Sequence, residues 1–412
     1  MNDNRFSQSQ DLFQRAARVV PGGIYGHTSP AVGLPGAFPY YAVRADGCRY
    51  WDADGHEYID YMCAYGPIVL GYNHPEVEEA AEKQRRDGNC FNHPTPLMVE
   101  LAEHLVDLVD FAGWAVFGKN GSDLTTWCVQ VAREHTRRKK ILSISGAYHG
   151  AHAWCTPGHG GLIEEDRVHV HPFAWNDLNS FHDLVKKYRG QIAAFITGPF
   201  HYPSFCDSAL PEPGFFAEIQ RICRQEGILF ILDDVRAGFR LDLGGSHRHF
   251  GFEPDLIVFC KALGNGHPIS AALGRPELKR AASNVFLTGS YWNSAVPMAA
   301  ARKTLEILQR DSLIPRINAM GERLMNGLRE KARQHGLQVR CTGPGAIPLM
   351  TFANETNLRR QQKFCAEAVR RGVFFHPHHN WFLCAAHREE DIDKSLEIAG
   401  QAFAAVKEVF GG

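Results

Sequence analysis

Short apolar runs alternate with amphipathic, helix-like stretches through the middle of this chain. Each run is four or five residues long and is bounded by polar residues or glycine, which is the pattern of strands buried on both faces. The runs are residues 114–117, 141–144, 192–196, 228–232, 256–259 and 269–273. Because helical stretches separate them, the alternation predicts βαβ units and an α/β fold with a mostly parallel sheet.

The two ends of the chain have different patterns. Apolar residues at helical spacing predict a helix from about Gln8 to Val20, and Asp-Gly pairs among aromatic and β-branched residues predict an antiparallel meander between Tyr40 and Met62. After Ala295 a long helical region precedes short apolar strands, among them residues 382–385, and two further helices. The expected segments are 1–76, the helix and meander of a small domain; 77–294, a large α/β domain; and 295–412, a C-terminal α+β domain.

Composition narrows the class of protein. A chain of 412 residues exceeds what one hydrophobic core usually holds, and 44% hydrophobic with 22% charged residues is typical of a globular enzyme. The formal net charge is −1, so the sequence has no excess of basic residues that would bind an anionic surface. We therefore expect neither nucleic acid nor a membrane surface as partner. Eleven cysteines without a Cys-x-x-Cys pair predict a cytoplasmic protein with reduced thiols. The sequence predicts neither a secretion signal nor a membrane span.

Two apolar runs end in residues with complementary chemistry. Lys261 follows the run 256–260, and Asp233 follows the run 228–232. Ligands of open α/β sheets bind beyond the carboxyl ends of the strands, so both side chains are expected at one site. The pair suits pyridoxal 5'-phosphate (PLP), since its aldehyde needs an amine and its ring nitrogen needs a carboxylate. The plain alternatives are a solvated strand end for Lys261 and a helix cap for Asp233.

Two further turns suit the same cofactor. In Phe117-Gly-Lys-Asn-Gly-Ser122 a strand leads into a helix, and the backbone amides at a helix start, with glycine and serine, form a phosphate cup. The alternative is an ordinary serine N-cap. The turn Gly146-Ala-Tyr-His-Gly150 can lay an aromatic ring on a flat heterocycle, or Tyr148 is only a turn residue.

In order and spacing these segments resemble the class III PLP-dependent aminotransferases, in the branch that includes glutamate-1-semialdehyde 2,1-aminomutase. The resemblance runs from Pro21-Gly-Gly23 to the helix at 389–393. Its most specific pieces are Gly66-Pro-Ile-Val-Leu-Gly-Tyr-Asn-His-Pro75, Asp233-Asp-Val-Arg-Ala-Gly-Phe-Arg240 and Lys261-Ala-Leu-Gly-Asn-Gly-His-Pro268. It implies an aspartate-aminotransferase-like fold of type I, in which the large domain binds PLP and amino transfer joins a donor amine to a carbonyl acceptor.

The resemblance also implies roles for single residues. Lys261 would be the catalytic Schiff-base lysine, and Asp233 would be the catalytic partner of the pyridine nitrogen. Gly289 and Ser290 match a segment that in relatives reaches the phosphate of the neighbouring subunit, which implies a homodimer with shared active sites. The implied cofactor contacts are Gly121, Ser122, Tyr148, His149, Asp233, Val235, Lys261, Gly289 and Ser290.

Three positions depart from the family pattern. Ser29 stands where aminomutases carry an arginine that pairs with the substrate carboxylate, and serine cannot replace a bidentate arginine. Gly198 stands where many members have glutamate before proline. Arg236 stands where relatives often have glutamine or an apolar residue; it either binds a substrate anion or serves as a structural ion-pair partner.

An aromatic and histidine-rich set of residues is the predicted wall of the substrate pocket. Ring faces and neutral imidazoles suit a bulky, polyhydroxylated or amino-sugar-like amine rather than a simple α-amino acid. The alternative is packing aromatics and surface histidines without a ligand role. With Arg236, the set is Tyr25, His27, Tyr65, His376 and His378.

The sequence therefore predicts an aminotransferase that moves an amino group between such an amine and an α-keto acid such as pyruvate or 2-oxoglutarate. One alternative keeps PLP but makes the enzyme an aminomutase of the glutamate-1-semialdehyde type. Another, suggested by 21 histidines and the cluster His376-Pro-His-His379, is a metal-binding protein or hydrolase. No His-Glu-x-x-His spacing accompanies that cluster, so we predict no metal site.

Overall fold

The computed structural model describes residues 4–24, 34, 37, 41–203 and 205–411. The chain divides into two compact units. The small unit comprises Met1–His74, Ser204–Ser208 and Pro315–Gly412, and the large unit comprises Pro75–Pro203 and Ala209–Ile314. Among the described helices, none has an apolar stretch long enough to cross a membrane.

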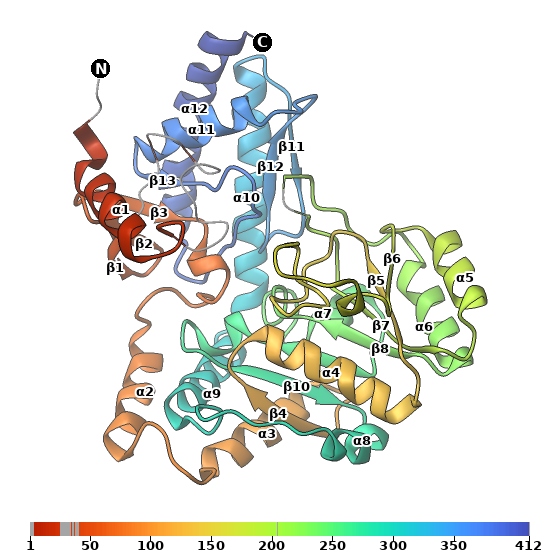
Figure 1. Ribbon diagram of the computed structural model, residues 1–412. Coiled ribbons are helices and arrows are strands. Elements are labelled where there is room, and N and C mark those ends of the chain that lie inside the picture. The colour runs from red at the N-terminus through yellow and green to blue at the C-terminus, as the bar shows by residue number, and fades with distance from the viewer. Residues whose placement is uncertain (1–3, 25–33, 35–36, 38–40, 204, 412) are drawn as a thin grey trace. The chain divides into compact units, whose positions relative to one another are not determined.

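A seven-stranded sheet organises the large unit, with strand order β4-β10-β9-β8-β7-β5-β6 (Figure 1). The strands are β4 (Trp114–Gly118), β5 (Lys140–Ile144), β6 (Val170–Phe173), β7 (Ile192–Thr197), β8 (Leu229–Asp233), β9 (Leu256–Phe259) and β10 (Ser270–Gly274). All six predicted strands are present. The seventh, β6, was not predicted, because its sequence Val-His-Pro-Phe is short, partly polar and contains proline, as suits an edge strand.

The strand directions bring several carboxyl ends to the same edge of this sheet. Strands β5 to β9 pair in parallel, whereas β10 is antiparallel to both β9 and β4. Because the chain direction reverses twice, β4 runs the same way as β9. The predicted α/β fold with a mostly parallel sheet is confirmed.

Helices flank the sheet of the large unit (Figure 1). They are α2 (Pro75–Asp87), α3 (Pro96–Leu108), α4 (Gly121–Thr136), α5 (Leu178–Lys187), α6 (Phe215–Glu226), α7 (Ser246–Phe250), α8 (Lys279–Asn284) and α9 (Ala295–Arg310). Short 3-10 turns occur at η4 (Glu164–Asp166), η5 (Lys261–Gly264) and η6 (Pro276–Leu278).

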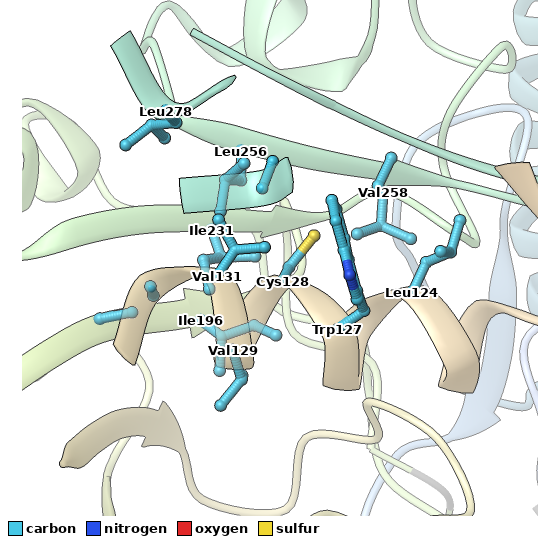
Figure 2. Close-up of a cluster of buried hydrophobic side chains, with 14 of the residues drawn as sticks. Leu124, Trp127, Cys128, Val129, Val131, Ile196, Ile231, Leu256, Val258 and Leu278 are labelled. Carbon is cyan, nitrogen blue, oxygen red and sulfur yellow. The ribbon is translucent and has the colours of Figure 1, made fainter. Parts of the chain in front are cut away.

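Helix α4 is held against the sheet by its apolar face. Figure 2 shows Trp127 and Cys128 of this helix facing Ile231, Leu256 and Val258 of the strands. All of these side chains are buried, and removing such apolar area from water contributes about 25 cal/mol per Å². The packing fixes where α4 begins, and therefore where its first backbone amides lie.

The small unit contains a four-stranded and a two-stranded sheet. The predicted meander is present as an antiparallel set, and its last strand pairs in parallel with a distant one. The strands are β1 (Ala42–Asp46), β2 (Arg49–Asp52), β3 (Glu57–Asp60) and β13 (Val373–Phe374), with β11 (Val339–Thr342) pairing β12 (Leu349–Phe352). The helices and 3-10 turns are η1 (Asn4–Phe6), α1 (Ser7–Val19), η3 (Cys63–Tyr65), α10 (Leu313–Gln334), α11 (Arg359–Val369) and α12 (Glu389–Phe410).

The helical region expected after Ala295 is present, and the boundaries between the two units differ from those expected. The long helical region is two helices, because the chain turns at Ser312, which has a φ of 48°. Helix α9 packs along α2 and α3, so the boundary expected after residue 294 lies after Ile314. The first boundary lies after His74 rather than after residue 76.

Residues 382–385 were predicted as a strand and do not form one. They form an irregular segment that ends in a turn, and its backbone is hydrogen-bonded to the chain on two sides. The N–H of Phe382 donates to the carbonyl of Tyr61 at 2.7 Å, and the N–H of Leu383 donates to that of Ala346 at 3.1 Å. The apolar pattern correctly predicted that these residues are largely buried, but they do not pair with one neighbouring strand in a ladder of hydrogen bonds.

We predict that Gly321→Ala in α10 lowers the thermal unfolding temperature. A Cβ at residue 321 would lie 1.7 Å from the carbonyl oxygen of Gly345, and overpacking against backbone costs about 1–3 kcal/mol or more. The matched control is Gly400→Ala in α12, where a Cβ would meet only the Cδ of Lys331 at 3.5 Å. That variant should be stabilised by about 0.5–1 kcal/mol, as is usual in helices. Equal stabilisation of both variants would contradict the close approach.

Candidate active site

A cavity of about 280 Å³ opens at the carboxyl edge of the large unit's sheet. Its lining comes from the turns after β4, β5, β7, β8 and β9 and from the start of α4. The lining residues are Asn120, Gly121, Ser122, Thr125, Tyr148, His149, Gly150, Tyr202, Asp233, Val235, Arg236, Cys260 and Lys261. The structure thus brings together Arg236 and the predicted cofactor contacts other than Gly289 and Ser290.

Asp233 is a buried carboxylate at the end of β8. Its Oδ2 lies 2.7 Å from Nδ1 of His149, and its Oδ1 accepts the N–H of Val235 at 3.2 Å. His149 is itself buried, and the hydroxyl of Thr125 donates to its carbonyl at 2.7 Å. These bonds join the turn after β5 to the end of β8 and hold the carboxylate in one orientation.

Lys261 occupies an uncommon backbone conformation directly after β9. Its φ of 46° lies in the left-handed region, which non-glycine residues seldom adopt and which is often found at functional sites. Burial, and next the guanidinium of Arg236, lower the pKa of the Lys261 amine to about 8. A larger share of the amine is therefore in its neutral, nucleophilic form near neutral pH than for an exposed lysine.

The start of α4 forms a cradle that only glycine permits. A Cβ on Gly121 would lie 2.8 Å from Cγ2 of Val235, and a Cβ on Gly150 would lie 2.5 Å from Oγ of Ser122. The first turn of α4 therefore lines the cavity with backbone and with Ser122. A helix start of this kind binds phosphate through its N–H groups and dipole. Together with a lysine amine and an oriented carboxylate, the cradle fits PLP.

Some cavity residues had not been predicted. Tyr202 lies in the segment after β7, and the expectation that ligands bind beyond strand ends could have found it. Thr125 is one turn into α4, on the same helix face as Gly121 and Ser122. Tyr148, as predicted from its turn, lines the cavity while its side chain stays 47% exposed.

Gly289 and Ser290 lie outside this cavity. Gly289 lines a separate cavity of about 420 Å³, together with Val99 and Trp292. The thiol of Cys90 donates to the carbonyl of Ser290 at 3.6 Å. Tyr291 beside them is 71% exposed. Within one chain, then, the predicted phosphate contacts at 289 and 290 do not meet those at 121 and 122.

Tyr65, His376 and His378 gather in the small unit. The hydroxyl of Tyr65 lies 3.5 Å from Nε2 of His376, and the ring centroids of His376 and His378 are 4.4 Å apart. Phe205 stacks on His378 at 4.5 Å. The remaining predicted pocket residues, Tyr25 and His27, and the departure at Ser29 lie outside the described residues.

The side chains with metal-ligand geometry differ from those suggested by the sequence. Within the described ranges, the group of three whose ligand atoms approach one another is Cys63, Cys384 and His387, not the histidines at 376–379. Nδ1 of His387 lies 3.3 Å from Sγ of Cys384 and accepts the backbone N–H of Cys384 at 3.0 Å. Nδ1 of His387 thus already accepts a hydrogen bond that closes the turn between residues 384 and 387.

Comparison with known proteins decides the family. The model of the class-III aminotransferases matches residues 34–401. The chain belongs to the class-III aminotransferase family.

Several relatives match along nearly the whole chain. An aminopentol aminotransferase of Sphingopyxis macrogoltabida is 45% identical over 400 residues, covering 97% of this chain and 94% of the relative. A 3-aminobutyryl-CoA aminotransferase of Cloacimonas acidaminovorans is 33% identical, covering 98% and 99%. A glutamate-1-semialdehyde 2,1-aminomutase of Syntrophobacter fumaroxidans is 31% identical, covering 98% of each chain.

A solved structure is similar throughout. The FumI protein of Sphingopyxis sp. MTA144, in its PLP internal aldimine form, superposes with a TM-score of 0.96 at 45% identity, covering 98% of each chain. The protein is therefore a PLP-dependent aminotransferase of the predicted fold, and the predicted family, cofactor and enzyme class are confirmed.

We predict that Lys261 of the cofactor-free protein titrates near pH 8. Its amine reacts with an acylating reagent only when deprotonated, so the labelling rate should rise with pH through a midpoint of about 8. Peptide mass spectrometry would follow the label, and Lys261→Arg would identify the background. A midpoint at the usual lysine value of about 10.4 would contradict the burial of the amine.

Proposed function

We propose that this aminotransferase moves an amino group between a bulky, polyhydroxylated primary amine and an α-keto acid such as pyruvate or 2-oxoglutarate. The observation that carries the proposal is the 45% identity to an aminopentol aminotransferase over nearly the whole chain. Ser29 stands where the aminomutases carry an arginine that pairs with the substrate carboxylate. Serine cannot replace that arginine, so the sequence favours the polyhydroxylated amine over a small amino acid as substrate.

The cavity residues that would hold the cofactor each have a proposed role. When bound, PLP supplies an aldehyde that bonds to amines and a ring that takes up electron density. The amine of Lys261 would hold that aldehyde, and, placed beside the reacting carbons, it would be the group that accepts and donates the proton. Asp233, oriented by His149, keeps a proton on the ring nitrogen, and the cradle at Gly121 and Ser122 holds the phosphate.

The faces of the cofactor ring and the amine also have proposed contacts. Val235 would pack against one face of the ring and Tyr148 against the other; both line the cavity with Asp233. Tyr65, His376 and His378 combine a phenol with imidazoles, groups that hydrogen-bond hydroxyls without requiring a charge on the ligand. This chemistry supports their assignment to the polyhydroxylated amine.

A homodimer is part of the proposal. Gly289 and Ser290 are the predicted contacts to the phosphate of a neighbouring subunit, and they lie outside the cavity of their own chain. Close to them in sequence, the large side chains of Tyr291 and Phe286 are 71% and 86% exposed. A second copy of the chain would cover them.

We predict that an aminopentol-type amine is converted faster than glutamate or 4-aminobutyrate. The amine should bleach the visible absorption of the PLP-loaded protein, and pyruvate or 2-oxoglutarate should restore it. A stopped-flow series over these amines gives kcat/KM for each half-reaction. If glutamate reacted faster than the polyhydroxylated amine, the proposed substrate class would be wrong while the aminotransferase assignment would stand.

We also predict distinct effects for the two central residues. Lys261→Ala should abolish turnover without unfolding the protein, because no other lysine is found among the described residues that line the cavity. Asp233→Asn should keep bound PLP yet slow turnover by about 10²–10⁴-fold, because the ring nitrogen loses its charged partner. Circular dichroism checks the fold and visible absorption checks the cofactor. Wild-type turnover in Asp233→Asn would remove Asp233 from its role.

A further inference from the structure

Gly198 and Tyr202 are packed against each other at the carboxyl end of β7. A Cβ at residue 198 would lie 2.9 Å from the hydroxyl oxygen of Tyr202 and 3.3 Å from its Cε1. Phe200 contacts the same ring edge-on, with centroids 5.0 Å apart. The missing side chain at 198 is therefore what allows the Tyr202 ring to lie where it does.

Arg236 stacks on that ring. Its Cζ lies 4.0 Å from the ring centroid of Tyr202, a close cation–π contact. Burial raises the pKa of the Tyr202 hydroxyl, so the ring remains neutral and offers its face rather than a phenolate. A guanidinium stacked through its face keeps its N–H donors in its own plane, the geometry in which arginine binds oxyanions bidentately.

The two residues that depart from the family pattern thus belong to one cluster of packed side chains, Gly198, Tyr202 and Arg236. The family resemblance leads us to expect glutamate at 198 and glutamine or an apolar residue at 236, whereas this chain has Gly198 and Arg236. A glutamate at 198 would collide with Tyr202 and displace the ring on which Arg236 lies. The glycine, the tyrosine and the arginine therefore depend on one another.

This cluster lies in the candidate active site. Tyr202 and Arg236 line the same cavity as Lys261 and Asp233. The carboxylate of Asp233 lies against Nδ1 of His149, and its charge also favours the charged form of the Arg236 guanidinium. Burial disfavours the charged guanidinium of Arg236 and lowers its pKa, so an oxyanion that enters the cavity gains from this cation.

We propose that Gly198, Tyr202 and Arg236 form an oxyanion-binding element of the active site, with Arg236 as the binding residue. The element rests on the proposed function, because its ligand is an oxygen of that reaction. Two sources share this chemistry: the carboxylate of the keto acid, and the ring oxygen of the cofactor.

The first test compares wild type with Arg236→Gln, Arg236→Lys and the control Arg221→Gln, all loaded with PLP. Arg221 is 58% exposed and pairs with Glu218, so its substitution removes a surface charge from the large unit without touching the cavity. Two quantities are measured: the dissociation constant of pyruvate for the aminated form, and the midpoint pH of the cofactor's absorption change.

Either of two results supports the element. If the ligand is the keto-acid carboxylate, Arg236→Gln weakens pyruvate binding by about tenfold or more, with the midpoint unchanged. If it is the ring oxygen, Arg236→Gln raises the midpoint by about one unit, because a nearby positive charge no longer opposes protonation. Arg236→Lys should retain part of either effect, and Arg221→Gln should match wild type.

The second test removes the platform and leaves Arg236 in the chain. Gly198→Ala places a methyl group against Tyr202 and should change the same quantity, in the same direction, as Arg236→Gln. Thermal unfolding of each variant shows whether the fold is kept. If Arg236→Gln left both quantities within twofold and about 0.2 pH units of wild type, the element would be wrong. Wild-type values in Gly198→Ala would likewise overturn the dependence of Arg236 on the platform. Bleaching of the wild type by the amine in the same experiment would keep the proposed function standing in either case.

Discussion

The common direction of the strands in the seven-stranded sheet is the constraint on which the active site depends. Parallel strands deliver their carboxyl ends to one edge, and β10 reverses the chain so that β4 joins them. Five separate turns therefore converge around one cavity. No single turn contains an active site. The turns after β9, β4 and β5 supply an amine, a glycine cradle and an aromatic ring, the turn after β8 supplies both a carboxylate and a cation, and the turn after β7 supplies the ring on which that cation stacks.

Precision at this edge comes from packing behind it. Helix α4 is anchored through Trp127 and Cys128 to the central strands, which sets the position of its first turn. The glycines at 121 and 150 then let backbone approach Val235 and Ser122 more closely than any side chain would allow. The 2.7 Å contact between His149 and Asp233 joins two of the converging turns. The reactive groups lie on a rigid scaffold, as preorganised catalysis requires.

Departures from a family pattern are most informative when the structure shows them in contact. Gly198 and Arg236 are 38 positions apart, and in the sequence each is a separate departure from the family pattern. Tyr202, which sequence reasoning did not single out, connects them physically. Gly198 and Arg236 depart from the pattern that the family resemblance implies, and the substrate side of a shared fold is where such differences are expected.

The sequence alone determined the order and type of most elements, because hydrophobic periodicity reports local burial directly. It also placed Lys261, Asp233 and the turn at 121–122 at strand ends, since a strand's direction follows the chain. Tertiary structure decided what depends on distant partners. The edge strand β6, the irregular segment at 382–385 and the inclusion of α9 in the large unit are set by packing that no local pattern records. The same holds for the ring of Tyr202 beneath Arg236, because its place is fixed by an absent side chain at residue 198 and not by the residues next to it.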